Sequence, residues 1–523
     1  MQRIGFILGL LFTYLLVGAQ DLDVQHYRYA IALNDENDRI EGEAEVVVKF
    51  LQPVQQFTLD LVQQSGYKGM QVSKVEGADV SGFAQRGNKL VVQLKGKVAT
   101  ASTNKYHVVY SGVPQDGLII AKNKYGDRTF FSDNWPNRAH HWIPCNDQPS
   151  DKASVEFVVT APAHYQVVSN GVQVEETALD KGRKVTHWKE VVPISTKIMV
   201  IGAARFAVKQ YTDSTNCVPV SAWVYPQDKE KGFYDYGLAA SILKFFSDYI
   251  APYPYQKLAN VQSKTMFGGM ENATAIFYNE HSVTGDRREE DLIAHEIAHQ
   301  WFGNTATEKS FPHVWLSEGF ATYLTNIYLG HKYGRDSMAK RLQEQRQKVV
   351  RYTRTTSAPV VDSTSELMDL LNANSYEKGA WVLHMLRGQV GDSTFKNIIR
   401  TYYNQYKGGN ADTRDFQRVA QKVSGKDFSS FFNQWLFQPG VPKLEVSWMV
   451  AGNELLVTAV QKQKNLCSFP LEIKVVDEKG GEQTYTISVS KALNTLPIPI
   501  KSKPVKVVLD PNTRLLFEGG VKQ

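Results

Sequence analysis

Cysteine is scarce in this sequence, with three in 523 residues, and this scarcity excludes a small fold held together by several disulfide bridges. Cys145, Cys217 and Cys467 also show no spacing typical of metal ligands. The three thiols allow at most one bridge, so at least one of them is left over.

Charge is also sparse and nearly balanced. Charged residues make up 21% of the chain, and 59 basic against 53 acidic residues give a net charge of +6. No dense block of Lys and Arg occurs, so we expect no nucleic-acid partner. The 42% hydrophobic and 11% aromatic content is typical of a folded protein with several cores. At roughly 150 residues per domain, the length favours about three or four domains.

Long apolar runs are absent except at the N-terminus. Arg3 precedes the largely apolar residues 4–17, and residues 17–19 form a small-residue cleavage pattern before Gln20. These features predict a secretory signal peptide over 1–19. A membrane anchor is the alternative, but the run of 14 residues is shorter than the roughly 20 that span a bilayer. We therefore expect a periplasmic or extracellular protein, with no membrane span in the mature chain.

The spacing of apolar residues divides the remaining chain into three parts. From 20 to 216 apolar and polar residues alternate, which predicts an antiparallel β domain. From 217 to 442 helical spacing dominates, with the clearest predicted helices at 239–249, 289–302, 338–352 and 380–390. Alternation returns over 443–523, which predicts a small C-terminal β-sandwich. The predicted fold class is thus multidomain α+β.

The most informative segment carries an HExxH motif between His295 and His299. Residues four apart share one face of a helix, so both histidines can bind one metal ion. Glu296 lies beside that face, which suits a general base acting on water at the metal. Asp286 and Glu289 resemble a capping box at the start of this helix. The pentapeptide can also arise by accident in a chain with 12 histidines, so a third ligand is needed to support it.

Glu318 is the candidate third ligand. It follows His299 by 19 positions, within the apolar and helix-patterned stretch 314–324, where an acidic side chain is costly to bury. The plainer alternative is a solvated helix residue. Two imidazoles and one carboxylate around Zn²⁺ leave a position open for water, and the bound water has a pKa of about 7. This set predicts one catalytic Zn²⁺ per chain and a hydrolytic reaction.

With Glu318 in the stretch WLSEGFATYL, the chain resembles the zinc aminopeptidases of the aminopeptidase N type, gluzincins that include leukotriene hydrolases. Ser317 stands where that family usually has Asn. A second family motif occurs as Gly268-Gly269-Met270-Glu271-Asn272, which ends 23 positions before His295. The resemblance implies a thermolysin-like catalytic domain in which this segment pairs with the peptide backbone and Glu271 binds the free α-amino group. Taken alone, the segment could be an ordinary glycine-rich edge segment.

A third match places Tyr376 in a segment, 375–380, whose tyrosine hydrogen-bonds the tetrahedral intermediate in the family. The resemblance implies that Glu296 and Tyr376 are the catalytic residues. The implied reaction is hydrolysis of the first peptide bond of peptides with a free N-terminus, by Glu296-assisted attack of zinc-bound water. An endopeptidase or an epoxide hydrolase could use the same site. A non-catalytic scaffold is a further alternative, which the retention of the whole residue set disfavours.

The chain departs from the family pattern in two places. Many members continue in a large helical C-terminal domain, whereas strand-patterned residues follow Pro442 here, so we expect a short form. When the chain is aligned on 144–149, the family's Gln or Glu that helps to hold the substrate amine falls at Trp135, which cannot accept a hydrogen bond. Either Asp133 substitutes from a shifted loop, or Glu271 holds the amine with less help. The preferred first residue and the oligomeric state are left open by the sequence.

Overall fold

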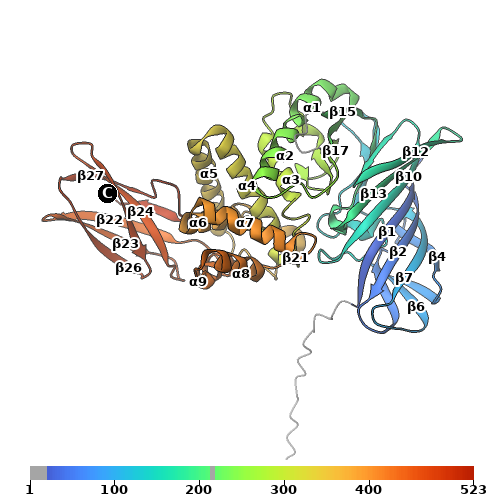
Figure 1. Cartoon of the computed structure of the whole chain (residues 1–523), viewed down its shortest axis with the longest axis horizontal. Helices are drawn as coiled ribbons and strands as arrows, with labels where there is room; N and C mark the ends of the chain where they lie inside the picture. The colour runs from blue at the N-terminus through green and yellow to red at the C-terminus, as the bar shows by residue number, and fades with distance from the viewer. Residues whose placement is uncertain (1–20, 212–217, 523) are drawn as a thin grey trace, which may run out of the picture.

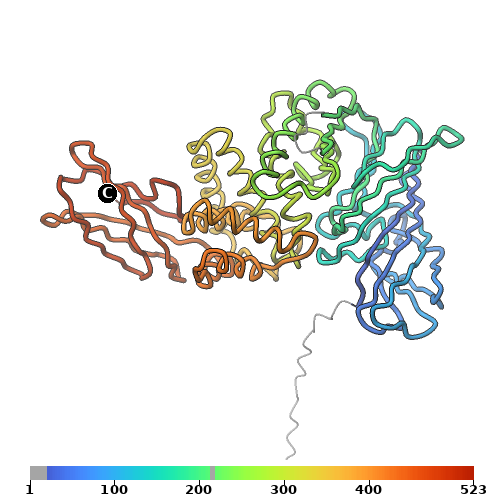
Figure 2. Tube along the Cα trace, viewed as in Figure 1, coloured from blue at the N-terminus to red at the C-terminus, as the bar shows by residue number. Residues whose placement is uncertain are grey.

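The structure is a computed structural model, and it describes residues 21–211 and 218–522. N-terminal sheets, helices and C-terminal strands follow one another along the longest axis (Figure 1), and the chain runs through them in sequence order (Figure 2). The predicted signal peptide, 1–19, lies outside the described residues. The predicted boundary between 216 and 217 also falls in a segment that is not described, so the domain limits stay predictions.

A seven-stranded sheet of order β12-β13-β10-β1-β2-β7-β4 forms the centre of the N-terminal region. Every second residue of its central strands is buried, which is the alternation that predicted them. β1 pairs antiparallel with β2 but parallel with β10, so the sheet predicted to be antiparallel contains one parallel pair. The strands are β1 (Leu22–Ala32), β2 (Ile40–Phe50), β4 (Gly69–Glu76), β7 (Thr103–Val113), β10 (Lys152–Pro162), β12 (Val172–Leu179) and β13 (Arg183–Ser195).

Two smaller sheets complete this region. The three-stranded sheet has the order β3-β6-β5, and the four-stranded sheet has the order β11-β14-β9-β8. Their strands are β3 (Val54–Asp60), β5 (Val80–Arg86), β6 (Lys89–Val98), β8 (Leu118–Lys122), β9 (Arg128–Ser132), β11 (Gln166–Ser169) and β14 (Ile201–Ala204). Short 3-10 turns η1 (Ala139–His141) and η2 (Thr196–Ile198) lie between strands.

The next part of the chain contains a five-stranded mixed sheet, and four of its strands lie within 217–442, where the sequence predicted mainly helices. Its order is β15-β16-β17-β19-β18. All residues of β16 and β17 are buried, so these strands lack the alternation that identifies a half-buried strand. The strands are β15 (Ala207–Tyr211), β16 (Val220–Val224), β17 (Leu258–Ser263), β18 (Gly269–Met270) and β19 (Ala275–Asn279).

Nine α-helices of the described chain follow or flank this sheet. The four helices expected from apolar spacing are confirmed with shifts of a few residues at their ends, as α2, α3, α5 and α6. A short ladder joins β20 (Thr307–Glu308) to β21 (Asn410–Ala411). The helices are α1 (Lys229–Tyr236), α2 (Leu238–Tyr249), α3 (Glu290–His299), α4 (Trp315–Tyr333), α5 (Arg335–Thr353), α6 (Gly379–Val390), α7 (Asp392–Tyr406), α8 (Thr413–Ser424) and α9 (Ser429–Phe432).

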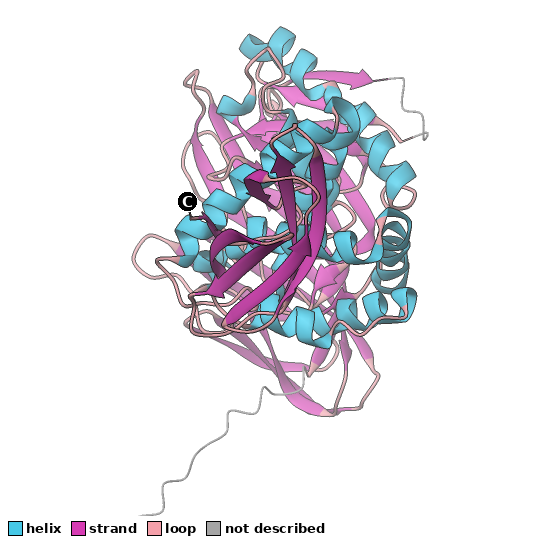
Figure 3. Cartoon of the chain, turned by 90° about the vertical axis from the view of Figure 1, so that its left-hand side faces the viewer, coloured by secondary structure: helices cyan, strands magenta, loops and turns pink. Residues whose placement is uncertain are grey.

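Seven strands after Pro442 form two C-terminal sheets, of order β26-β23-β22-β28 and β25-β24-β27. They stand in front of the helices when the molecule is viewed from its C-terminal end (Figure 3). The predicted α+β fold class is confirmed. Among the helices of residues 21–211 and 218–522, none has the length and hydrophobicity of a membrane-spanning segment. The strands are β22 (Lys443–Ala451), β23 (Glu454–Gln461), β24 (Phe469–Asp477), β25 (Glu482–Val489), β26 (Leu493–Pro499), β27 (Pro504–Leu509) and β28 (Glu518–Val521).

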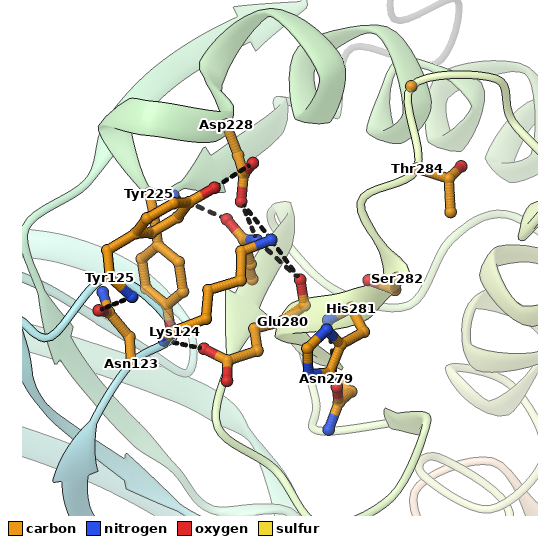
Figure 4. A network of polar contacts seen from close by, with 12 residues as sticks. Asn123, Lys124, Tyr125, Tyr225, Asp228, Asn279, Glu280, His281, Ser282 and Thr284 are labelled. Carbon is orange, nitrogen blue, oxygen red and sulfur yellow. Dashed lines mark hydrogen bonds and ion pairs between the residues drawn. The ribbon is translucent and has the colours of Figure 1, made fainter.

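A network of polar contacts around the buried carboxylates of Asp228 and Glu280 fastens the N-terminal region to the five-stranded sheet (Figure 4). Lys124, in the loop after β8, extends its Nζ to within 2.7 Å of Asp228, and its backbone N–H donates to Glu280 at 2.8 Å. Burial would raise the pKa of Asp228, but hydrogen bonds from Lys124, Tyr125 and Gln262 outweigh it and hold that pKa below its usual value. The network therefore fixes the N-terminal region beside β19, which follows the segment 268–272.

Candidate functional site

Two neighbouring helices bring the three predicted ligands together. His295 and His299 lie one turn apart on α3, and Glu318 lies in the first turn of α4. The Nε2 atoms of the two histidines are 3.0 Å apart, and each lies 3.3 Å from Oε2 of Glu318. The side chains of His299 and Glu318 are 1% and 5% exposed. The side chain of His295 is 17% exposed, so the three groups converge on one point that is open only on the side of His295.

The geometry of this cluster fits Zn²⁺. A tetrahedral zinc with bonds of about 2.0–2.1 Å separates its ligand atoms by about 3.3–3.4 Å, close to the separations seen here. Nδ1 of His299 lies 3.1 Å from the carbonyl oxygen of Phe302 and 3.1 Å from Oγ of Ser317. A carbonyl can only accept, so we assign the proton to Nδ1, which leaves Nε2 free to bind a metal. Ser317, the departure from the family pattern, thus contacts a candidate ligand.

The three candidate ligands and the nearby carboxylates affect one another's pKa values. Burial alone would lower the pKa of His299, but Glu318 and the other acidic groups raise it to about 9. Burial would raise the pKa of Glu318, but the two histidines hold it well below its usual range. Burial lowers the pKa of His295, so the carboxylates favour a positive charge on His299 and not on His295.

The predicted capping box at the start of α3 is wrong. Asp286 instead accepts from the hydroxyl of Thr284 at 2.8 Å and from the backbone N–H of Arg288 at 3.2 Å. Arg287 adopts a positive φ of 62°, and the helix begins only at Glu290, without a side-chain cap. The loop makes its own hydrogen bonds, which leaves the side chain of Asp286 unavailable to the helix.

Glu296 lies beside the cluster, with its side chain against β18. A Cβ built at Gly269 would collide with the carboxylate of Glu296, so the glycine leaves the space that this carboxylate occupies. Burial, with the carboxylates of Glu271 and Glu318 adding to it, raises the pKa of Glu296 well above its usual value. A raised pKa makes the carboxylate a stronger base, which suits a group that takes a proton and later returns it.

β18 lies at the edge of the five-stranded sheet, where its second side is open to an extended ligand. Glu271 follows this strand and is 4% exposed. Its Oε1 is buried without a hydrogen-bond partner among the described residues. A buried carboxylate oxygen without a partner is costly, so this position suits a cationic group of a ligand.

A close approach of two glycines places Tyr376 at the cluster. A Cβ on Gly319, the residue after Glu318, would lie 2.9 Å from Cα of Gly379, so α4 and α6 touch through their backbones. Tyr376 belongs to the π-helical turn η7 (Asn374–Lys378), and its ring stacks on His295 with centroids 5.9 Å apart. Burial, together with nearby carboxylates, raises the pKa of Tyr376, so the phenol stays protonated and can donate.

One cavity of about 440 Å³ contains these groups. Its lining includes every predicted site residue except Asn272, which is fully buried. Arg341, Gln345 and Lys348 of α5 form a wall that the sequence did not identify, because no motif marks them. Arg341 pairs with Asp291 at 3.2 Å and Lys348 pairs with Glu377 at 3.1 Å, so this wall carries little uncompensated charge.

Trp135 lines this cavity and Asp133 does not. Asp133 is buried, and its carboxylate accepts from Arg138 at 2.6 Å, from the hydroxyl of Thr265 at 2.8 Å and from the N–H of Met266 at 3.1 Å. These bonds hold Asp133 away from the cavity. Of the two alternatives, the structure therefore favours Glu271 as the acidic group at this end of the cavity.

The chain matches two family models along most of its length. Residues 23–198 match the one described as the Peptidase M1 N-terminal domain, and residues 234–435 match the one described as the Peptidase family M1 domain.

Several curated proteins are similar in sequence. A probable aminopeptidase 2 of Sulfurisphaera tokodaii is 28% identical over 422 residues, which are 76% of this chain and 53% of that protein. The glutamyl aminopeptidase of Rattus norvegicus is 27% identical over 375 residues, 69% of this chain and 38% of the relative. The chain thus spans about half the length, or less, of these relatives.

A solved structure shares the fold. The aminopeptidase A of Legionella pneumophila, in a crystal structure with aspartic acid, superposes with a TM-score of 0.85 at 16% sequence identity. The match covers 97% of this chain and 60% of the other. At this identity the likeness establishes the arrangement of strands and helices alone.

Proposed function

Because the chain belongs to the peptidase M1 family, we propose that it is a zinc-dependent aminopeptidase that hydrolyses the first peptide bond of peptides with a free N-terminus. The main support for the proposal is that a candidate metal-binding cluster lines the same cavity as the buried carboxylate of Glu271, whose Oε1 has no hydrogen-bond partner among the described residues. A carboxylate at this place selects an ammonium group and leaves room for one residue before the reacting bond.

His295, His299 and Glu318 would hold the zinc, which acidifies a water molecule and polarises a carbonyl when it is bound. Glu296 takes a proton from the attacking water and delivers it to the leaving amine. Tyr376 donates a hydrogen bond to the oxygen on which negative charge develops. Gly269 and Met270 align the peptide along the open edge of β18, and Glu271 holds its α-ammonium group.

The requirement for a free amine tests this function. We expect N-acetylation of an aminoacyl reporter substrate to lower kcat/KM by about 30-fold or more, because leaving one partner of a buried charge pair unpaired costs roughly 2–5 kcal/mol. Matched free and acetylated substrates are compared with and without a chelator. Equal cleavage of both would favour an endopeptidase, and turnover of an epoxide without peptide hydrolysis would favour an epoxide hydrolase. Failure of every substrate in the zinc-loaded protein would support a non-catalytic scaffold.

Replacing Tyr376 by Phe removes the proposed donor to the developing oxyanion. We expect kcat to fall by about 10²–10³-fold with little change in KM, because this bond is made in the transition state. The control is Tyr323→Phe, which removes the hydroxyl of a buried tyrosine that contacts His384 outside the cavity. Unchanged kcat in Tyr376→Phe would remove this residue from the mechanism.

We also propose export through the signal peptide predicted over 1–19, which would place the enzyme in the periplasm or outside the cell. Arg3 and the apolar run 4–17 support this proposal.

A further inference from the structure

The residues Glu271 to Thr274, called the amine loop below, connect β18 to β19. Thr274 adopts a φ of 65°, a left-handed conformation that is rare for a β-branched residue. Such a backbone persists where its surroundings determine it, and such positions cluster at functional sites. No described residue donates a hydrogen bond to Oε1 of Glu271, so the backbone of the loop contributes strongly to the position of this carboxylate.

Two side chains from the segment that follows α3 hold the first residue of the amine loop. Nε2 of Gln300 donates to the carbonyl oxygen of Glu271 at 2.8 Å, and Nδ2 of Asn304 donates to the same oxygen at 2.7 Å. Oε1 of Gln300 accepts from the N–H of Thr274 at 3.0 Å. Gln300 and Asn304 are fully buried. The loop is thereby tied to the segment that follows His299.

The N-terminal region holds the loop from the other side through Asn170, in the turn between β11 and β12. Its Nδ2 donates to the carbonyl oxygens of Ala273 at 2.6 Å and Ile198 at 2.9 Å, and its Oδ1 accepts from the N–H of Val200 at 2.6 Å. The next residue, Gly171, donates its N–H to Oγ1 of Thr274 at 2.7 Å. Asn170 is 1% exposed, so water does not replace these bonds readily.

These contacts come from two parts of the chain that are far apart in sequence, and both end on the backbone of the amine loop. We infer that Asn170, together with Gln300 and Asn304, positions Glu271 for binding the substrate amine. The inference rests on the proposed function, because it takes Glu271 as the group that binds the amine. In this role, Asn170 makes the N-terminal β region contribute to substrate recognition, although none of these three side chains lines the cavity.

Asn170→Ala is the direct test. The variant loses the donor to Ala273, one of several bonds that hold the loop, so the loop can shift, and a misplacement of about 1 Å near a reacting centre can cost about 10²-fold in rate. We expect KM for a free aminoacyl substrate to rise about tenfold or more, with kcat within about threefold of wild type. Cleavage of the N-acetylated substrate, which does not use Glu271, should stay unchanged, so the preference for a free amine falls. Zinc content should remain one per chain.

Two further variants sharpen the test. Asn170→Asp keeps the acceptor for Val200 but cannot donate to Ala273, so it should behave like Asn170→Ala. Asn304→Ala removes a donor from the α3 side and should show the same rise in KM. The control is Asn494→Ala in β26, which removes a buried asparagine whose Nδ2 donates to the carbonyl of Lys491 at 2.7 Å. It should leave KM and substrate preference at wild-type values.

The outcomes separate this inference from the proposed function. A wild-type protein that cleaves free and acetylated substrates equally contradicts the proposed function. Suppose instead that the wild type requires the free amine, while folded and zinc-loaded Asn170→Ala keeps the KM of the wild type and its preference for a free amine. This result would contradict the positioning role and leave the proposed function intact. If neither Asn170 variant folds, as judged by thermal melting, Asn304→Ala decides, and an unchanged KM there also overturns the inference.

Discussion

Glu296→Gln is expected to lower kcat by about 10²–10⁴-fold, the contribution typical of a positioned general base. Glutamine has nearly the same shape but cannot take a proton from the attacking water or return one to the leaving amine. Glu296 is buried beside Gly269, and burial together with Glu271 and Glu318 raises its pKa. The structure thus surrounds this carboxylate with conditions that favour proton transfer.

The zinc content and thermal stability of Glu296→Gln should match those of the wild type, because Glu296 does not belong to the cluster of candidate ligands. The measurements are kcat and KM for a free aminoacyl substrate, elemental analysis and thermal melting. Glu344→Gln, which neutralises an exposed carboxylate on α5, is the control. Full activity in Glu296→Gln with one zinc bound would show that another group transfers the proton.

The ligand cluster could be predicted because its geometry is largely local. His295 and His299 share a helix face through their spacing, and an acidic residue in an apolar stretch signals Glu318. Glu271 and Tyr376 were identified through family resemblance, since a carboxylate after a glycine pair or one tyrosine among 25 carries no chemical signal alone. The structure shows what brings Tyr376 to the cluster, namely the contact of Gly319 with Gly379.

Other features could not be predicted from the sequence because they depend on contacts between segments that are far apart in the chain. β16 and β17 are buried on both faces, which removes the period-two signal and explains why the five-stranded sheet was missed. Asn170 lies 103 positions from Ala273, and nothing in the intervening sequence indicates that their atoms meet. The position of Asp133 likewise depends on hydrogen bonds from Arg138 and Thr265, which the sequence does not indicate.

Glu318→Gln is expected to remove the bound metal and the activity together. An amide carries no charge to balance a divalent cation, and the two imidazoles that remain are neutral when they bind zinc. Changes in residues that only contact the zinc ligands already lower the affinity for zinc by about 10–100-fold. We therefore expect the loss of the ligand Glu318 to lower this affinity by more than about 100-fold. Elemental analysis after dialysis, and activity as a function of added zinc, measure the loss.

The chelated wild type is the matched reference for this variant. Binding of metal to the folded state stabilises it by about 4.1 kcal/mol when the metal is at 1,000 times its dissociation constant, so removal of the metal should lower the melting temperature. If Glu318→Gln lacks only the metal, its melting temperature should equal that of the chelated wild type. Added zinc should restore the activity of the chelated wild type but not that of the variant. If the variant keeps one zinc per chain and the kcat of the wild type, Glu318 is not a zinc ligand, and another residue must complete the site with His295 and His299.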